Sequence, residues 1–192
     1  MQKKEMQKGN KAILITLYLK IITFVLVLFF LVAYSVIPEI SNAISLLTVI
    51  LWGGANLAFI IVAIFAVIDC VRLYQAGQLG LLRSNTRNIK FGAIPYFVLN
   101  FLLWILITFV LIMGSRGLFI FTPIPLLLIL PVIDCFFSML VTSIYSIGFT
   151  AGLKHFGRMS GGAAAGLIVM QLLFVLDEVA AVVLIASKRY KV

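Results

Sequence analysis

The chain has 192 residues, of which 64% are hydrophobic and 11% charged, and its formal net charge is +9 at pH 7. Globular proteins have roughly 45–50% apolar and about 25% charged residues, so this composition excludes a soluble domain and indicates a bilayer protein. The basic residues stand at the ends of apolar runs and not on a face with interleaved aromatic residues, so we expect no nucleic-acid partner.

Five apolar stretches are long enough to cross a hydrocarbon layer, which takes about 20 helical residues. The predicted spans cover residues 15–37, 44–68, 94–113, 124–151 and 163–186. They lack the alternation of barrel strands, so the expected fold class is all-α, a polytopic α-helical membrane bundle that forms one integral membrane domain over residues 1–192. The first apolar run is longer than the hydrophobic region of a signal peptide, and we expect it to stay uncleaved.

The distribution of Lys and Arg predicts the orientation. Ten of them fall on the side of the N-terminus and four on the other side, which favours a multi-pass protein of the cell (cytoplasmic) membrane with its N-terminus in the cytoplasm. The tail SKRYKV then lies outside, whereas an alternative with four spans and a re-entrant last segment returns it inside. Between the second and third spans we predict a basic cytoplasmic loop, residues 72–92, which would meet anionic lipid or a partner through Arg72, Arg83, Arg87 and Lys90.

Three acidic residues interrupt the last two predicted spans. An ionisable side chain at mid-bilayer costs at least ~2.5–3.5 kcal/mol on insertion scales, so each one needs an explanation. Asp134 and the adjacent Asp177 and Glu178 are predicted to reach a similar depth, and no Lys or Arg is predicted there, so the carboxylates should hold protons or a cation. The predicted intramembrane cation or proton site consists of Asp134, Asp177, Glu178, Asn56 and Gln171.

A polar stripe follows Asp134 along one face of the fourth span. Serine and threonine recur every four residues with a tyrosine beside them, and Pro131 is predicted to kink the helix just before the stripe. This pattern predicts a polar path toward the basic KHFGR end through Ser138, Thr142, Tyr145 and Ser146. In the alternative interpretation these hydroxyls bond their own helix and the stripe only packs against neighbours.

Other features indicate structural roles. Lys20 in the first span and Asp69 at the end of the second are predicted to form a structural ion pair. Pairs of small residues that would let helices approach closely are Gly54 with Ala58 and Gly162 with Gly166. The two cysteines form no CxxC pair and His155 lies among basic residues, so we expect no metal and no cofactor.

These features favour a small transport-related or transporter-accessory subunit, not an enzyme. So few helices would need a homo-oligomer or a membrane or ATPase partner subunit to enclose a pathway. One alternative is a non-catalytic interaction protein with an immunity, assembly or regulatory role; another is an intramembrane aspartyl-type hydrolase using Asp134 and Asp177, although the GxGD pattern of such proteases is absent. In composition the chain resembles small polytopic membrane proteins of bacteria.

Overall fold

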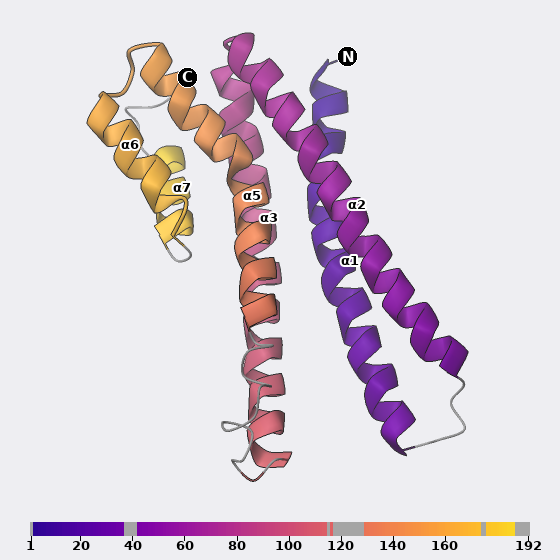
Figure 1. Cartoon of the computed structure of the whole chain (residues 1–192). Helices are drawn as coiled ribbons and strands as arrows, with labels where there is room; N and C mark the ends of the chain where they lie inside the picture. The colour runs from indigo at the N-terminus through magenta and orange to yellow at the C-terminus, as the bar shows by residue number, and fades with distance from the viewer. Residues whose placement is uncertain (1, 37–41, 115, 117–128, 174–175, 187–192) are drawn as a thin grey trace. The chain divides into compact units, whose positions relative to one another are not determined.

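The computed structural model of the chain describes residues 2–36, 42–114, 116, 129–173 and 176–186; within them it describes only the backbone of residues 2–9, 31–32, 34–36, 42–43, 45 and 130. Nearly all of these residues are helical, and no strand occurs among them. Figure 1 labels the helices in chain order. The all-α fold class is therefore confirmed.

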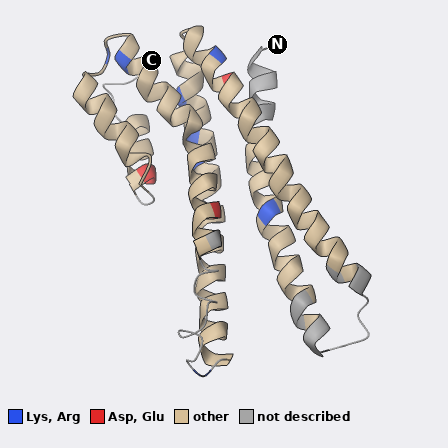
Figure 2. Ribbon diagram, in the orientation of Figure 1, with Lys and Arg blue, Asp and Glu red and all other residues tan. Residues whose placement is uncertain are grey.

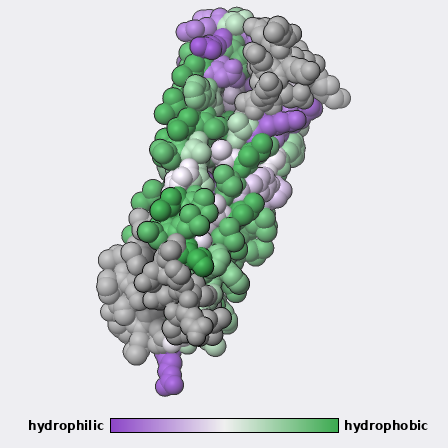
Figure 3. Space-filling model, turned by 90° about the vertical axis from the view of Figure 1, so that its right-hand side faces the viewer, coloured by the Kyte–Doolittle hydropathy of each residue, from purple (hydrophilic) through white to green (hydrophobic). Residues whose placement is uncertain are grey.

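Four helices in the described ranges are long and apolar enough to cross a membrane. They are α1 (Gln2–Val36), α2 (Asn42–Gln75), α3 (Leu79–Gly114) and α5 (Ile129–His155). Charged positions are sparse along these helices (Figure 2), and apolar residues make up most of the coloured surface visible in Figure 3. A hydrocarbon solvent suits such a surface, which confirms a helical membrane protein.

The fifth predicted span, 163–186, is not one helix. It is divided between α6 (Gly161–Met170) and α7 (Leu176–Ala186), each too short to cross a bilayer alone. Ser160 caps the start of α6 by accepting a hydrogen bond from the Ala163 amide at 3.4 Å. Helix α7 turns back beside α6 (Figure 1), so the pair forms a hairpin whose two ends lie on one side. Four long helices and a returning segment replace five spans, as in the alternative topology.

The chain divides into two compact units, Met1–Asp69 and Cys70–Val192, which we describe separately. In the first unit, the rings of Phe24 and Trp52 lie 6.0 Å apart, and the Lys20 ammonium lies 4.5 Å from the centroid of the Phe59 ring. Later residues of α1 thus meet earlier residues of α2, so the two helices run antiparallel. The expectation of a single membrane domain stays a prediction.

In the second unit, α3 and α5 pack antiparallel along most of α5. Lys90 of α3 meets Ser143 of α5 at 2.8 Å, and farther along α3 the side chains of Tyr96 and Ser138 share a hydrogen bond. The contact between α3 and α5, which we call the seam, buries hydroxyl and small side chains of α5. Such residues are usual between membrane helices, because an apolar side chain is as well accommodated by lipid as by another helix. Fully buried polar residues of α5 are Ser138, Thr142, Ser143, Ser146 and Thr150.

Two glycines on α5 permit close approach of its neighbours. A Cβ at Gly148 would lie 2.3 Å from Cys70 Sγ, and one at Gly152 would lie 2.4 Å from Leu79 Cδ2. By contrast, a Cβ at Gly54, Gly162 or Gly166 would have no described atom within 4 Å. The small-residue contact therefore uses a GxxxG pair that the sequence analysis did not select.

The predicted basic loop 72–92 is almost entirely helical, which corrects that prediction. Helix α2 continues to Gln75 and α3 begins at Leu79, so the connection is only a turn. Gly77 adopts a left-handed φ of 65°, its amide donates to Tyr74 O at 3.1 Å, and Gln78 N donates to Leu73 O at 3.0 Å. This Schellman cap needs a residue that tolerates positive φ. Arg72, Arg83, Arg87 and Lys90 are consequently helical residues.

Two prolines of the second unit, Pro95 and Pro131, lie in described helices. Pro131 was expected to kink a helix, but α5 begins at Ile129, so Pro131 stands in the first turn, where no helical hydrogen bond is lost. Pro95 lies inside α3. Because Pro95 has no N–H, the Phe91 carbonyl lacks its usual helical donor.

Candidate functional site

The two adjacent acidic residues stand at the start of a helix. Because α7 begins at Leu176, Asp177 and Glu178 occupy its first turn. Backbone N–H groups there lack intrahelical partners and carry partial positive charge, which favours carboxylates. The break between α6 and α7 thus explains why acids occur within an apolar run: they begin a new helix at the tip of the hairpin.

Asp177 forms a buried ion pair with Lys90 of α3. The two side chains are 1% and 2% exposed, so each charge is removed from water and compensated by the other. Ser143 of α5 contacts both partners, since its Oγ accepts from Lys90 Nζ at 2.8 Å and lies 2.8 Å from Asp177 Oδ1. Met139 O is also 2.8 Å from this hydroxyl, so the Ser143 proton has two acceptors. Three helices meet at this ion pair.

Glu178 is a second carboxylate beside the same lysine. Its Oε1 lies 3.9 Å from Lys90 Nζ, and its side chain is 31% exposed. Oε1 itself is buried and has no hydrogen-bond partner within the described part of the chain. With all three groups ionised, one ammonium faces two carboxylates, so the cluster has a surplus negative charge that Glu178 carries.

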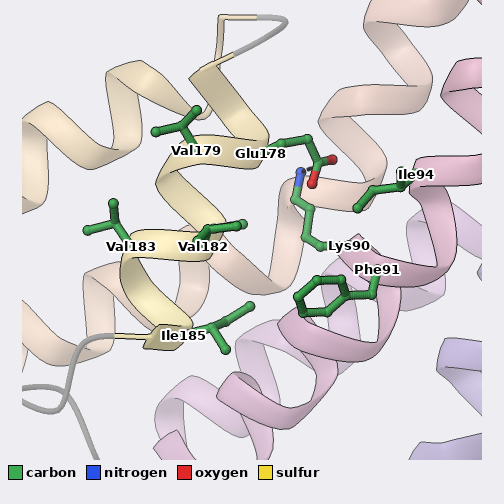
Figure 4. Close-up of a pocket in the computed structure, with 9 residues that line it drawn as sticks. Lys90, Phe91, Ile94, Glu178, Val179, Val182, Val183 and Ile185 are labelled. Atoms are coloured by element: carbon green, nitrogen blue, oxygen red, sulfur yellow. Dashed lines mark ion pairs between the residues drawn. The ribbon is translucent and has the colours of Figure 1, made fainter.

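Two cavities adjoin this cluster. The larger, about 280 Å³, lies between α3 and α7, and the smaller, about 180 Å³, reaches Met139 of α5. Ile94 and Glu178 line both of them. Figure 4 shows Lys90 and Glu178 pointing toward each other from opposite helices, with Phe91 and Ile185 beside the larger cavity. The surroundings of the surplus carboxylate are therefore mainly apolar.

A buried polar group lies between the ion pair and the His155 end of α5. Gln171, at the end of α6, donates from Nε2 to Thr150 Oγ1 at 3.3 Å, and Thr150 donates to Ser146 O at 2.8 Å. Gln171 Oε1 and Ser146 Oγ are buried and have no hydrogen-bond partner among the residues that the structure describes. Buried polar atoms of this kind usually bind ordered water.

All four residues of the predicted polar path, Ser138, Thr142, Tyr145 and Ser146, are buried in the second unit. Thr142 donates to Met139 O of its own helix at 2.8 Å, as the packing interpretation expects. Ser138 is bonded to Tyr96 across the seam. Ser146 Oγ is buried and has no hydrogen-bond partner among the described residues, and a continuous path stays a prediction.

The five residues of the predicted cation site do not form one ring. Asp177 and Glu178 stand together at the start of α7, whereas Gln171 directly follows the end of α6. Asp134 lies nine residues before Ser143 on α5, about 13 Å along the helix axis, and acts electrostatically on Tyr96. Asn56 belongs to the first unit, where its Nδ2 donates to Trp52 O at 2.9 Å.

The expectation that no basic residue reaches the carboxylates is wrong, because Lys90 does. A helical signal for Lys90 was present in the sequence: the buried residues of α3 recur every three or four positions from Leu79 through Lys90 to Asn100. Treating residues 72–92 as a loop concealed that period. Arg83, also assigned to the loop, donates to Ile185 O at the end of α7.

Comparison with known proteins gives a family but no activity. Residues 8–191 match the model of a family of unknown function, DUF6652. The chain belongs to this family. No curated protein and no solved structure matches it. The DUF6652 match extends over α3, α5, α6 and α7 in full, so the ion pair and both cavities lie within the family region.

Two further predictions concern residues outside this cluster. Lys20 of the DUF6652 chain is buried, and its ammonium lies over the ring of Phe59. Phe59 stands ten residues before Asp69 on α2, and the ion pair between Lys20 and Asp69 stays a prediction. Cys70 and Cys135 are free thiols, and no group of three or more His, Cys, Asp or Glu suited to a metal ion occurs in the described ranges.

Proposed function

We propose that the chain is a small transport-related or transporter-accessory membrane protein that exchanges a proton or cation at Glu178. One observation carries the proposal: two carboxylates share one buried lysine. Asp177 is compensated by Lys90 and Ser143, whereas Glu178 is 3.9 Å from the same ammonium and its Oε1 has no hydrogen-bond donor in the described structure. Intramembrane carboxylates of this kind mark ion and proton sites.

The charge balance supports exchange at Glu178. A cluster of Lys90⁺, Asp177⁻ and Glu178⁻ has net charge −1, which a low-dielectric environment disfavours. A proton or monovalent cation on Glu178 brings the net charge to zero and leaves the Lys90–Asp177 pair intact. The cluster can thus load and release one positive charge without exposing an unpaired ammonium.

The hairpin supports a cytoplasmic entrance to this site. With four spans and a re-entrant segment, both termini lie on one side. Of the fifteen Lys and Arg residues, Arg116 is then on the other side, Lys20 lies within the first span and Lys90 in the buried ion pair. The remaining twelve are on the side of the termini, which by the positive-inside rule favours termini in the cytoplasm of the cell membrane. Ser146, Thr150 and Gln171 lie on the cytoplasmic side of the ion pair in this topology, and water bound there would carry protons to it.

Further protein is needed to enclose a pathway. Apolar side chains of α2 and α3 are exposed along these helices. We therefore propose that the chain works as a homo-oligomer or beside a membrane or ATPase partner subunit.

Flux measurements in vesicles test the proposal. Purified protein would be reconstituted with a pH-sensitive dye inside the vesicles, and proton entry measured under an imposed membrane potential. We expect Glu178→Gln to lower the flux at least tenfold, Glu178→Asp to retain part of it, and the matched carboxyl control Asp134→Asn to leave it unchanged. Equal flux in wild type and Glu178→Gln would overturn the assignment of Glu178 as the exchanging group, provided that circular dichroism and gel filtration show both proteins to be folded.

A non-catalytic interaction protein is the second candidate, and it also uses Glu178. Because Lys90 already compensates Asp177, Glu178 is the carboxylate available to pair with a basic residue of another chain. Purification in mild detergent should then recover a stoichiometric membrane partner from wild type that Glu178→Gln loses. A lone oligomer without a partner, together with Glu178-dependent flux, supports transport instead.

A further inference from the structure

The α3–α7 cavity has the properties of a binding site for a molecule that is both apolar and cationic. Its volume is about 280 Å³, and its walls are aliphatic or aromatic except at Lys90 and Glu178. This volume is just below the range of ~300–1,000 Å³ that small-molecule sites occupy, and Ile94 and Glu178 also line the smaller cavity. Figure 4 shows Lys90 and Glu178 meeting from the two helices, with apolar side chains of both helices around them.

The charges of Lys90, Asp177 and Glu178 favour a cationic ligand over an anionic one. Lys90 is occupied by Asp177 and Ser143, so an anionic headgroup would compete with a formed ion pair and meet Glu178. An ammonium would instead compensate the surplus charge of the Glu178 carboxylate, whose side chain is 31% exposed.

Two further groups favour a cation at this wall. Phe91 lines the larger cavity and Phe97 the smaller, and aromatic faces attract ammonium groups. A phospholipid headgroup fits less well, because its phosphate would approach Glu178.

We propose that the α3–α7 cavity binds a single-chain lipophilic ammonium ion, with the ammonium on Glu178 and the alkyl chain along Ile94 and Val182. The ligand would enter from the membrane, since the cavity lies between apolar helix surfaces. This inference rests on the proposed function, in which Glu178 is the exchanging group, and names the class of cation that it exchanges for a proton.

Direct binding measurements test this site separately from flux. Radiolabelled dodecylammonium, with dodecanol and dodecyl sulfate as competitors, would be applied to the full chain in nanodiscs of neutral phosphatidylcholine. We expect saturable dodecylammonium binding that excess dodecanol and dodecyl sulfate displace at least tenfold more weakly than unlabelled dodecylammonium. Glu178→Gln should weaken binding at least tenfold.

Val182→Trp, which fills the cavity and leaves the charges of Lys90, Asp177 and Glu178 in place, should also abolish dodecylammonium binding. Val110→Trp is the matched control, because Val110 is exposed on α3 away from both cavities. Equal binding in wild type and Val182→Trp, or equal competition by dodecanol, would overturn the inference. Glu178-dependent proton flux without dodecylammonium binding would reject this ligand class but leave the proposed function standing, whereas loss of both observations would reject both.

Discussion

Lys90 and Asp177 are 87 residues apart in the chain, yet they form a buried ion pair that joins α3 to the start of α7. At the other end of α7, Arg83 of the same helix α3 donates to Ile185 O. The returning helix is therefore attached to α3 by polar contacts at both ends. In lipid, apolar contacts distinguish protein from solvent only weakly, so these two contacts should contribute much of the specificity of hairpin docking.

The ion pair leads to a first prediction about stability. Lys90→Met leaves Asp177 buried without its counter-ion, and removing one partner of a buried pair costs about 3–5 kcal/mol. We expect a lower midpoint of thermal unfolding in detergent, measured by circular dichroism. Arg87→Met, at an exposed position one turn earlier on α3, should change the free energy of unfolding by less than about 0.5 kcal/mol.

The double variant distinguishes an ion pair from independent contributions. Lys90→Met combined with Asp177→Leu removes both charges, so the loss should be smaller than the sum of the two single losses by about 1–3 kcal/mol. Additive losses would show that the two side chains do not stabilise each other.

Ser143 gives a second prediction. Ser143→Ala removes the hydroxyl that contacts both members of the ion pair, and an unmade hydrogen bond at a buried charged group costs about 1–3 kcal/mol. The same thermal measurement should show this loss, whereas Ser84→Ala, at a half-exposed position of α3, should remain close to wild type. If both serine variants unfold at the wild-type temperature, Ser143 contributes nothing to the pair.

The long apolar helices could be predicted from the sequence because hydrophobicity over about 20 residues is a strong signal. Their ends could not. Helix α3 begins fifteen residues before the predicted span 94–113, because its first turns carry arginines and asparagines that hydropathy reads as a loop. A helix can project beyond the hydrocarbon layer, and only the spacing of buried residues such as Leu82, Ile89 and Ala93 reveals it.

The site was predicted only in part for a related reason. Hydropathy identified Asp177 and Glu178 as unusual, but it treated residues 163–186 as one helix. The acidic pair is itself a helix-start signal, because carboxylates favour the first turn. Asp134 was grouped with them by a depth inferred from hydropathy, but it lies about 13 Å along α5 from Ser143. Which face meets which neighbour depends on packing, as with the glycine pair of α5.

That glycine pair gives a third prediction. Gly148→Ala places a methyl group 2.3 Å from Cys70 Sγ, so α5 must move away from the end of α2, and overpacking of this kind costs about 1–3 kcal/mol. Gly152→Ala should cost less, because the tip of Leu79 can rotate away. Gly166→Ala has open space around it and should gain up to ~1 kcal/mol from higher helix propensity. Thermal unfolding of the three variants in one detergent checks this order; equal effects at Gly148 and Gly166 would contradict close packing at the seam.

The re-entrant hairpin gives a fourth prediction, on topology. Because α7 returns to the side from which α6 starts, a reporter after Val192 should lie on the same side of the membrane as one at the N-terminus. Single cysteines added at each end of a chain carrying Cys70→Ala and Cys135→Ala can be labelled with a membrane-impermeant maleimide. In intact cells we expect neither end to react, and in inside-out vesicles both should react. A continuous span over 163–186 would place the two ends on opposite sides, so that one of them reacts in intact cells. Reaction of both ends in intact cells would keep the hairpin but reverse the orientation that the positive charges predict.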